Sequence, residues 1–292
     1  MIMEKTHVSK ILKANHVSEI LGLSPGKKQY LDLLKQLHPD VCLLPGANDA
    51  TAKLNYLWKA YSEEKIFFDD AGKIIYDDKK MIFSGEKELL NISLSNFRLL
   101  TSLAGNKANP FRAYLPVSME FSGDSLIVEN NKRFVPLTRL TLDEVHVAWI
   151  LSRIYELVAW LHQAGYCHAG LNPDSICVVP ETHGIICVSF YHLKKMDTRL
   201  TTVSNKYLNW YPPGVFSMKT ASPVIDLTLA RKTAIFSLGD KSGHGVILKK
   251  VFNEELVDFL LSNQGEAFST YNKYRDLLER IFGKPTFHEL KI

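Results

Sequence analysis

Histidine and cysteine side chains are the first candidates for chemistry in this chain, which has ten histidines and four cysteines. Cys167 and His168 are adjacent, and His162 lies near them in the sequence. A metal site would need further ligands, and no Asp or Glu stands at ligand spacing. A cysteine nucleophile would need an exposed thiol beside an activating base, whereas the residues around Cys167 indicate a buried position. We therefore expect no metal ligand and no nucleophile here.

A second polar segment, His38-Pro39-Asp40, follows a stretch with helical periodicity. Apolar residues recur at three- and four-residue spacing and predict a helix over residues 27–37 with one apolar face: Tyr30, Leu31, Leu34 and Leu37. Lys28 and Lys35 are seven residues apart, so they share the opposite face. Because Pro39 disfavours the helical conformation at His38, the helix ends there and the tripeptide lies in a loop.

A second helix is predicted after a turn-like stretch at residues 43–47. Leu54, Leu57 and Tyr61 repeat at helical spacing, and Asn48 is the expected N-cap. Two antiparallel helices joined by the polar loop result.

These residues resemble the J-domain, the module of the DnaJ family of co-chaperones, in four places: Leu21-Gly22-Leu23-Ser24, the basic helix, His38-Pro39-Asp40 and Lys59-Ala60-Tyr61. The resemblance covers about residues 11–66. It implies that a DnaK-type heat-shock chaperone binds this segment and that the segment stimulates the chaperone's ATP hydrolysis. The residues implied in binding are His38, Pro39, Asp40, Lys27, Lys28 and Lys35. The lysines would attract an acidic partner over a distance, and the short loop would set its orientation.

The clearest helix of the chain is predicted from the capping box Thr141-Leu-Asp-Glu144 to Gly165. Its apolar stripe requires burial: Val147, Ile150, Leu151, Ile154, Val158 and Leu161. The loop residues 166–175 follow, then two strands at 176–179 and 185–188 around a turn, and then Ser189-Phe190-Tyr191.

This order is similar to the catalytic core of protein kinases, which has His-Arg-Asp-Leu, an Asn five residues after the Asp, a hairpin and then Asp-Phe-Gly. Further on, Tyr211-Pro-Pro-Gly214 resembles the family's Ala-Pro-Glu segment, and Asp226 resembles the acidic residue that opens its buried central helix. Residues 284–290 resemble the closing segment. The resemblance spans about residues 70–290 and implies a two-lobed kinase-like fold.

The departures from the family fall on the groups that do chemistry. The position of the general base is Gly170, that of the following Lys is Asn172, and those of the metal-binding Asn and Asp are Ser175 and Ser189. The positions that pack the loop are kept: His168, Leu171, Pro173, Phe190 and Asp226. No Gly-x-Gly-x-x-Gly lies between two strands. The resemblance therefore implies a pseudokinase without catalytic residues, bound metal or cofactor.

Shorter elements are predicted between these segments: strands at 73–76, 81–83, 112–115 and 125–129, and a helix at 86–103. The expected fold class is α+β. A small all-α J-domain over residues 1–66 precedes a small β-rich lobe over 67–138 and a larger helical lobe over 139–292. Residues 66–72 are expected to be a short linker.

Composition and charge exclude several other classes of protein. With 292 residues, 46% of them hydrophobic, the chain can bury a sizeable core. No run approaches the roughly 20 apolar residues of a membrane span, and the first 16 residues lack the apolar core of a signal peptide. The formal charge of +4 divides evenly on either side of Ile66, so no nucleic-acid partner is expected. The cysteines have no Cys-x-x-Cys spacing, which favours reduced thiols and a cytoplasmic location.

Three functions are compatible with these features. In the first, the J-domain-like segment engages a DnaK-type chaperone while the kinase-like body binds an unknown protein client. In the second, the body is an atypical kinase or nucleotide-binding enzyme. In the third, the chain is a structural component whose J-like segment only docks.

Overall fold

The computed structural model describes residues 5–15, 17–21, 27–38, 40–105, 109–263, 265–284, 288 and 290. The chain divides into two compact units, one of Met1–Phe67 with Ile75–Asp78 and the other of Phe68–Ile74 with Lys79–Ile292. Among the described helices, none combines the length and the apolar character that crossing a membrane requires.

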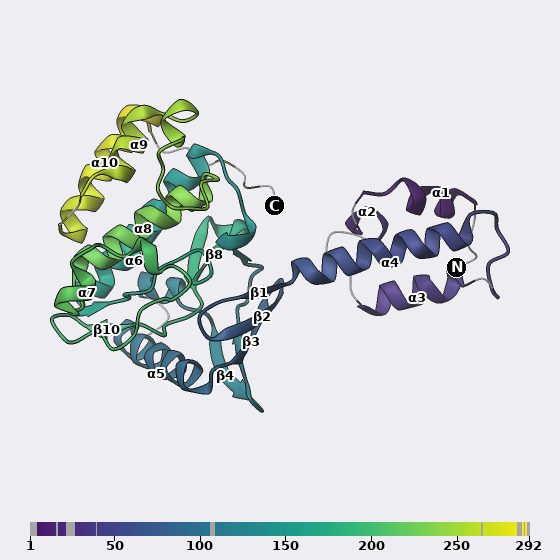
Figure 1. Ribbon diagram of the computed structural model, residues 1–292, viewed down its shortest axis with the longest axis horizontal. Helices are drawn as coiled ribbons and strands as arrows, with labels where there is room; N and C mark the ends of the chain where they lie inside the picture. Colours follow the sequence, from purple (N-terminus) through teal and green to yellow (C-terminus); the bar gives the residue numbers. More distant parts are fainter. Residues whose placement is uncertain are drawn as a thin grey trace. The chain divides into compact units, whose positions relative to one another are not determined.

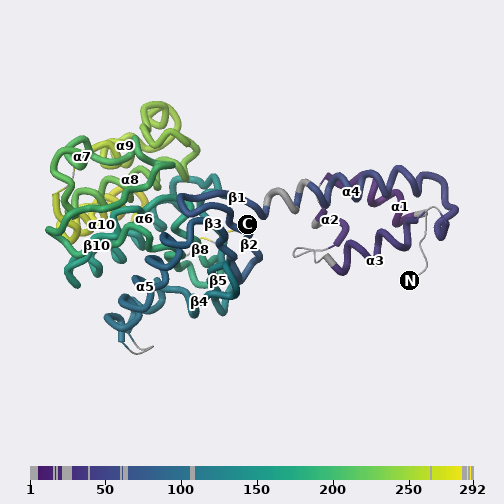
Figure 2. Tube along the Cα trace, turned by 60° about the horizontal axis from the view of Figure 1, so that its bottom comes forward, coloured from purple at the N-terminus to yellow at the C-terminus, as the bar shows by residue number. Residues whose placement is uncertain are grey.

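The N-terminal unit consists of helices α1 (Lys5–Lys13), α2 (Ser18–Leu21), α3 (Lys27–Leu37) and α4 (Ala47–Glu64). Both α1 and α3 pack against α4 (Figures 1 and 2). Their apolar residues form one buried cluster: Val8, Ile11, Leu37, Ala50 and Leu54. At about 25 cal/mol per Å² of apolar surface removed from water, such a cluster supplies most of the stability of a small helical unit.

Helices α3 and α4 are antiparallel, as the sequence predicts. Thr51 Oγ1 donates a hydrogen bond to the Leu37 carbonyl near the connecting loop, and Tyr30 at the far end donates to Asn55 Oδ1 over 2.8 Å. The bounds of α3 match the prediction, but α4 begins at Ala47. Asn48 therefore lies inside the first turn and is not the N-cap. Helix α1 was not predicted.

A five-stranded sheet has the order β1-β2-β3-β5-β4, and most of its residues belong to the second unit. The strands are β1 (Ile66–Phe68), β2 (Gly72–Asp77), β3 (Lys80–Gly85), β4 (Ser118–Ser122) and β5 (Ser125–Glu129). Strand β5 pairs antiparallel with β3 and β4, with Val128 opposite both Met81 and Met119. Residues 66–68 and 72 lie in strands, so the expected linker over 66–72 is wrong: its apolar residues pair in the sheet.

Helix α5 (Lys87–Ala104) follows β3 and lies with the sheet on one side of this unit (Figures 1 and 2). Residues 112–115, predicted as a strand, instead belong to the 3₁₀ helix η1 (Pro110–Tyr114) and its C-cap. Pro110 opens η1, and Asn109 Oδ1 accepts a hydrogen bond from Phe111 N, a local cap that overrides the strand propensity of these residues.

The helical part of this unit is built on α6 (Glu144–Gln163), α8 (Pro223–Ser237), α9 (Glu254–Leu261) and α10 (Ala267–Phe282). Helix α6 packs against both α8 and α10 (Figure 1). Its N-cap is Asp143, whose carboxylate accepts from His146 N, so the predicted capping box at Thr141 is wrong by two residues. The prediction of a mixed α+β chain with a sheet-rich part and a helical part is confirmed.

The short strands of this unit include β7 (Tyr166–Cys167), β8 (Ile176–Val179) and β9 (Gly184–Cys187). The hairpin β8–β9 forms as the sequence predicts, with Cys177 opposite Ile186. Strand β6 (Val135–Pro136) pairs with β8, and β10 (Lys194–Lys195) with β7. Short elements, η2 (Leu137–Arg139), η3 (Pro180–Thr182), η4 (Leu208–Trp210), α7 (Val215–Met218) and η5 (Leu248–Lys250), link the rest.

Candidate functional site

The first turn of helix α8 anchors the backbone of the loop between β7 and β8. Asp226 is fully buried, and its two carboxylate oxygens accept hydrogen bonds from the backbone N–H groups of His168 (2.8 Å) and Ala169 (2.7 Å). Ala169 has a positive φ of 56°, a strained conformation for a residue with a side chain. The carboxylate therefore fixes the path of the backbone on which any group at position 170 would sit.

The position predicted to be that of a general base, Gly170, has no space for a side chain. A Cβ at Gly170 would overlap Cδ2 of His192 and lie 3.1 Å from its Cγ. His192 is buried, and its Nδ1 lies 3.0 Å from Thr202 Oγ1. The imidazole ring of His192 occupies the space that a catalytic carboxylate would need.

Asn172 and Ser175 serve the loop itself. Asn172 Oδ1 accepts from Asp174 N and Ser175 N, and Ser175 Oγ accepts from Asn172 N at 3.0 Å. Asp174 between them is buried, and its Oδ2 accepts from Lys206 Nζ (2.7 Å) and from the Tyr207 hydroxyl (3.0 Å). The side chains of Asn172 and Ser175 thus hold the backbone of this loop in place.

The Ser189-Phe190-Tyr191 segment lies against α5. Ser93 Oγ accepts from Phe190 N at 3.0 Å, and Asn96 Nδ2 donates to the Phe190 carbonyl at 2.8 Å. The ring of Phe190 also stacks on Phe97 with centroids 6.4 Å apart. His168 Nε2 lies 3.1 Å from the Ser189 carbonyl oxygen. These contacts join the sheet-side helix to the loop.

Two carboxylates from the turn between β1 and β2 close this region. Asp69 Oδ2 accepts from the Tyr191 hydroxyl at 2.7 Å, and its Oδ1 accepts from Ala71 N and Gly72 N. Asp70 Oδ1 accepts from Asn205 N at 2.9 Å and from Lys206 N. Asp70 Oδ2 also lies 3.4 Å from His192 Nε2, within hydrogen-bond distance.

Gly72 allows the turn between β1 and β2 to pack closely against Ser84 in β3. Its φ is +136°, and a Cβ there would lie only 2.6 Å from the Ser84 carbonyl oxygen. A residue with a side chain would push the turn away and withdraw the two Asp carboxylates from the loop.

The resulting site is acidic and nearly filled. Burial raises the pKa of Asp69 to about 6, and burial also raises the pKa of Asp174. Burial opposes ionisation of Asp70 as well, but its hydrogen bonds, His192 first, leave the pKa of Asp70 lowered. The cavity among these groups has a volume of about 10 Å³. That space is at the lower limit for one water molecule, far below the size of a phosphate group.

One side-chain group near this loop has the composition of a metal site. His162, Cys167 and Asp226 each place a ligand atom within 4.8 Å of the others. The sequence shows no carboxylate near His162 because Asp226 comes from another helix, 64 residues away. The hydrogen bonds already account for this group, since Asp226 receives two backbone N–H groups and lies 2.9 Å from His162 Nε2.

The loop predicted to bind a chaperone lies between α3 and α4 in the N-terminal unit. The side chains of His38 and Asp40 are 60% and 86% exposed, and His38 Nδ1 lies 3.4 Å from Asp40 Oδ2. Lys28 and Lys35 are exposed on α3. Pro39, residues 22–24 and the side chain of Lys27 lie outside the described residues. The structure therefore leaves the polar atoms of this loop accessible to a partner.

No family model matches the sequence, and no curated protein matches it. Among solved structures, the chain is similar to "Structure of vaccinia related kinase 3", with 12% sequence identity, 74% of this chain and 90% of that chain covered, and a TM-score of 0.44. A likeness of this degree has no bearing on what the chain binds or does.

Four residues of the loop site were missed by sequence reasoning: Asp69, Asp70, Asp174 and His192. The signal for the first two was an Asp-Asp-Ala-Gly turn between two apolar strands. No local pattern points to His192, because its partner Asp70 is 122 residues away.

The two groups Asp69 and His168 act on stability with opposite signs at acidic pH. Burial lowers the pKa of His168 to about 4, so the unfolded chain binds that proton first and stability falls as the pH drops from about 6.5 to 4. The pKa of Asp69 is raised from 3.8 to about 6, so the folded chain binds that proton first and stability rises as the pH drops over the same range.

Replacing Asp69 with Asn removes the carboxylate whose protonation in the folded chain offsets the destabilising protonation of His168 in the unfolded chain. Relative to the parent chain, the free energy of unfolding of the variant should fall by about 1.4 kcal/mol per pH unit below pH 6, or about 3 kcal/mol in all. Urea unfolding followed by tryptophan fluorescence at several pH values between 7 and 4.5 measures this slope. Asp124→Asn, at a 92% exposed carboxylate, is the control and should follow the parent chain. Parallel curves for the parent and Asp69→Asn would contradict the assignment.

Proposed function

We propose that this chain is a co-chaperone-like adaptor. Its N-terminal unit engages a DnaK-type heat-shock chaperone and stimulates its ATP hydrolysis, while its second unit binds a protein client without transferring phosphate. The observation that carries the proposal is the exposed pair His38 and Asp40, held between two antiparallel helices with Lys28 and Lys35 exposed on one of them.

The geometry of the N-terminal unit supports recognition rather than chemistry. The loop is anchored at both ends, since Leu37 is fully buried and Val41 N and Cys42 N both donate to the His38 carbonyl at 2.8 Å. The side chains of His38 and Asp40, between these anchors, are polar and accessible. Exposed lysines on α3 would speed association with an acidic surface, and the fixed loop would select its orientation.

The second unit supports a kinase-like body that does not act as a kinase. The order of its elements follows the kinase resemblance, in which the turn between the first two strands covers the nucleotide phosphates. Here that turn carries Asp69 and Asp70, whose charge and hydrogen bonds oppose entry of a triphosphate. His192 fills the space beside Gly170. Client binding is the function that remains for this body in the proposal.

The decisive experiment measures single-turnover ATP hydrolysis by a DnaK-type chaperone with and without the full chain. We expect a several-fold rise in the rate with the chain present. In parallel, ATP with magnesium should leave the melting temperature of the chain alone unchanged. No stimulation together with a nucleotide-induced melting shift would favour an enzyme, and neither effect would favour a structural component.

A further inference from the structure

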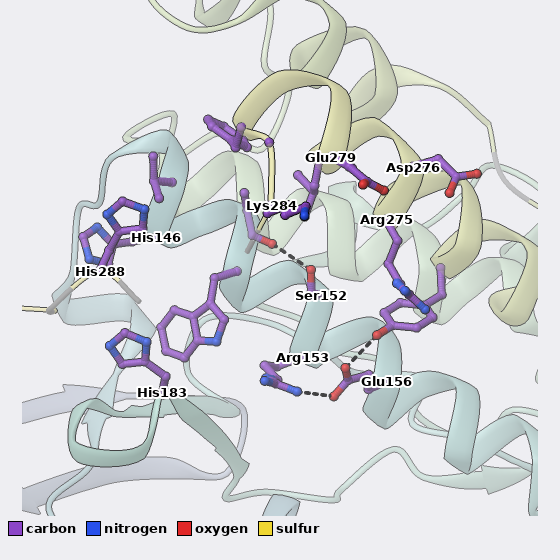
Figure 3. Close-up of a pocket in the computed structure, with 17 residues that line it drawn as sticks. His146, Ser152, Arg153, Glu156, His183, Arg275, Asp276, Glu279, Lys284 and His288 are labelled. Atoms are coloured by element: carbon purple, nitrogen blue, oxygen red, sulfur yellow. Dashed lines mark hydrogen bonds and ion pairs between the residues drawn. The ribbon is translucent and has the colours of Figure 1, made fainter. Parts of the chain in front are cut away.

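A second cavity lies away from the loop site, in the helical part of the second unit. Its volume is about 480 Å³, within the range of cavities that bind small organic molecules. It is formed by the first half of α6, the second half of α10 and the turn of the β8–β9 hairpin (Figure 3). Apolar side chains from both helices line it: Val145, Ala148, Leu278 and Phe282.

One end of this cavity gathers nitrogen donors and imidazoles. His146, His183 and His288 lie on the same side of the cavity in Figure 3. The indole ring of Trp149 lies over His183, with ring centroids 4.7 Å apart. Trp149 Nε1 is buried and has no hydrogen-bond partner among the residues that the structure describes, and the same holds for His146 Nε2. Because an indole N–H can only donate, it requires an acceptor.

Nearby carboxylates do not supply that acceptor. Asp143 Oδ1 accepts from His146 Nδ1 at 2.7 Å, which leaves Nε2 of the same ring directed elsewhere. Glu156 accepts from Arg153 Nη1 (2.8 Å) and from the Tyr271 hydroxyl (2.7 Å), and also from Tyr114. Asp276 and Glu279 are exposed and lie across the cavity from the histidines in Figure 3.

Basic side chains surround His183 at this end of the cavity. Burial lowers the pKa of His183, and the neighbouring His146, His288 and Arg153 lower it further. These groups disfavour another positive charge at His183. The exposed Lys284 lines the same cavity.

We propose that this cavity binds a small organic oxyanion, a carboxylate or phosphate monoester attached to an apolar body. The apolar body packs between α6 and α10. The oxyanion accepts a hydrogen bond from Trp149 Nε1, and the ammonium group of Lys284, which lines the same cavity, attracts it. This site is separate from the loop site and from the chaperone-binding loop, so it does not depend on the function proposed above.

The test uses the full chain and four probes: benzoate, phenyl phosphate, benzyl alcohol and inorganic phosphate. Isothermal titration should show that benzoate or phenyl phosphate binds at least tenfold more tightly than benzyl alcohol and inorganic phosphate. The tighter of the two aromatic anions identifies the head group as a carboxylate or a phosphate. Equal affinity for benzoate, phenyl phosphate and benzyl alcohol, or no binding of either aromatic anion at 10 mM, would overturn the proposal.

Two variants test whether the anion binds in this cavity. Trp149→Phe keeps an aromatic ring over His183 but removes the N–H, and Lys284→Gln removes an exposed charge with little effect on folding. Each should weaken binding of the preferred anion, by about tenfold for Trp149→Phe. His244→Gln, at an exposed histidine outside the cavity, is the matched control and should bind as the parent chain does. Unchanged affinity in both cavity variants, at unchanged melting temperature, would show that the anion binds elsewhere.

Discussion

Replacing His38 with Gln is expected to abolish stimulation of a DnaK-type chaperone while leaving the fold intact, and Asp40→Asn is expected to do the same. Both side chains are more than half exposed and belong to no apolar cluster among the described residues. Surface substitutions of this kind usually change stability by less than about 0.5 kcal/mol. Their effect on a partner is larger, because a docked polar group that loses its hydrogen bond leaves the opposing group desolvated and unpaired.

The measurement is the chaperone's single-turnover ATPase rate at saturating full-length chain, together with the helical circular dichroism signal and melting curve of each variant. Asp49→Asn is the matched control, since it also removes an exposed carboxylate from this unit but lies inside α4. We expect the control to stimulate as the parent chain does. Stimulation by both loop variants at the parent level would refute the assignment of this loop.

The elements that could be predicted from the sequence are those defined by local patterns of apolar residues and turns. Helix α3 was predicted with its observed bounds, and the hairpin β8–β9 was predicted to within a residue, because each is defined by periodicity and turn residues over a short stretch. Strand β4 was not predicted. It pairs with β5 through the turn Gly123–Asp124, and Phe121 faces Leu126 across the pair. Its register depends on its partner more than on its own composition.

The sequence analysis singled out the loop as a candidate site but did not identify the side chains that fill it. Gly170, Ser175 and Ser189 were identified as departures from a catalytic pattern. The side chains that surround these positions could not be predicted from the sequence, because Asp70 and His192 meet only after the turn between β1 and β2 folds over the loop. Contacts over such sequence separations follow from tertiary packing, which short-range periodicity does not encode.

Placing a carboxylate at Gly170, which the kinase resemblance aligns with the general base, should destabilise the chain and create no kinase. In Gly170→Asp the new Cβ overlaps the buried His192 ring, which Thr202 and Asp70 hold in place. Overpacking of this kind costs about 1–3 kcal/mol, and the added carboxylate enters a buried site beside Asp174 without a partner. We expect a loss of at least about 3 kcal/mol, or roughly 6 to 12 °C in melting temperature.

Gly265→Asp is the control, because no atom lies within 4 Å of a Cβ built there, and its melting temperature should match that of the parent chain. A double-mutant cycle with His192→Ala identifies the cause of the loss. If the clash is responsible, the double variant is more stable than the sum of the two single effects predicts, because removal of the ring makes room for the carboxylate.

The same logic extends to phosphoryl transfer. Adding Ser175→Asn and Ser189→Asp to Gly170→Asp introduces the residue types that kinases have at the positions aligned by the resemblance. Asp69 and Asp70 would still contact Tyr191 and His192 beside these positions. The triple variant should therefore show no magnesium-dependent autophosphorylation with radiolabelled ATP. Activity in the triple variant, or a Gly170→Asp chain as stable as its control, would mean that the turn opens readily and that the acidic closure of this site is not what prevents catalysis.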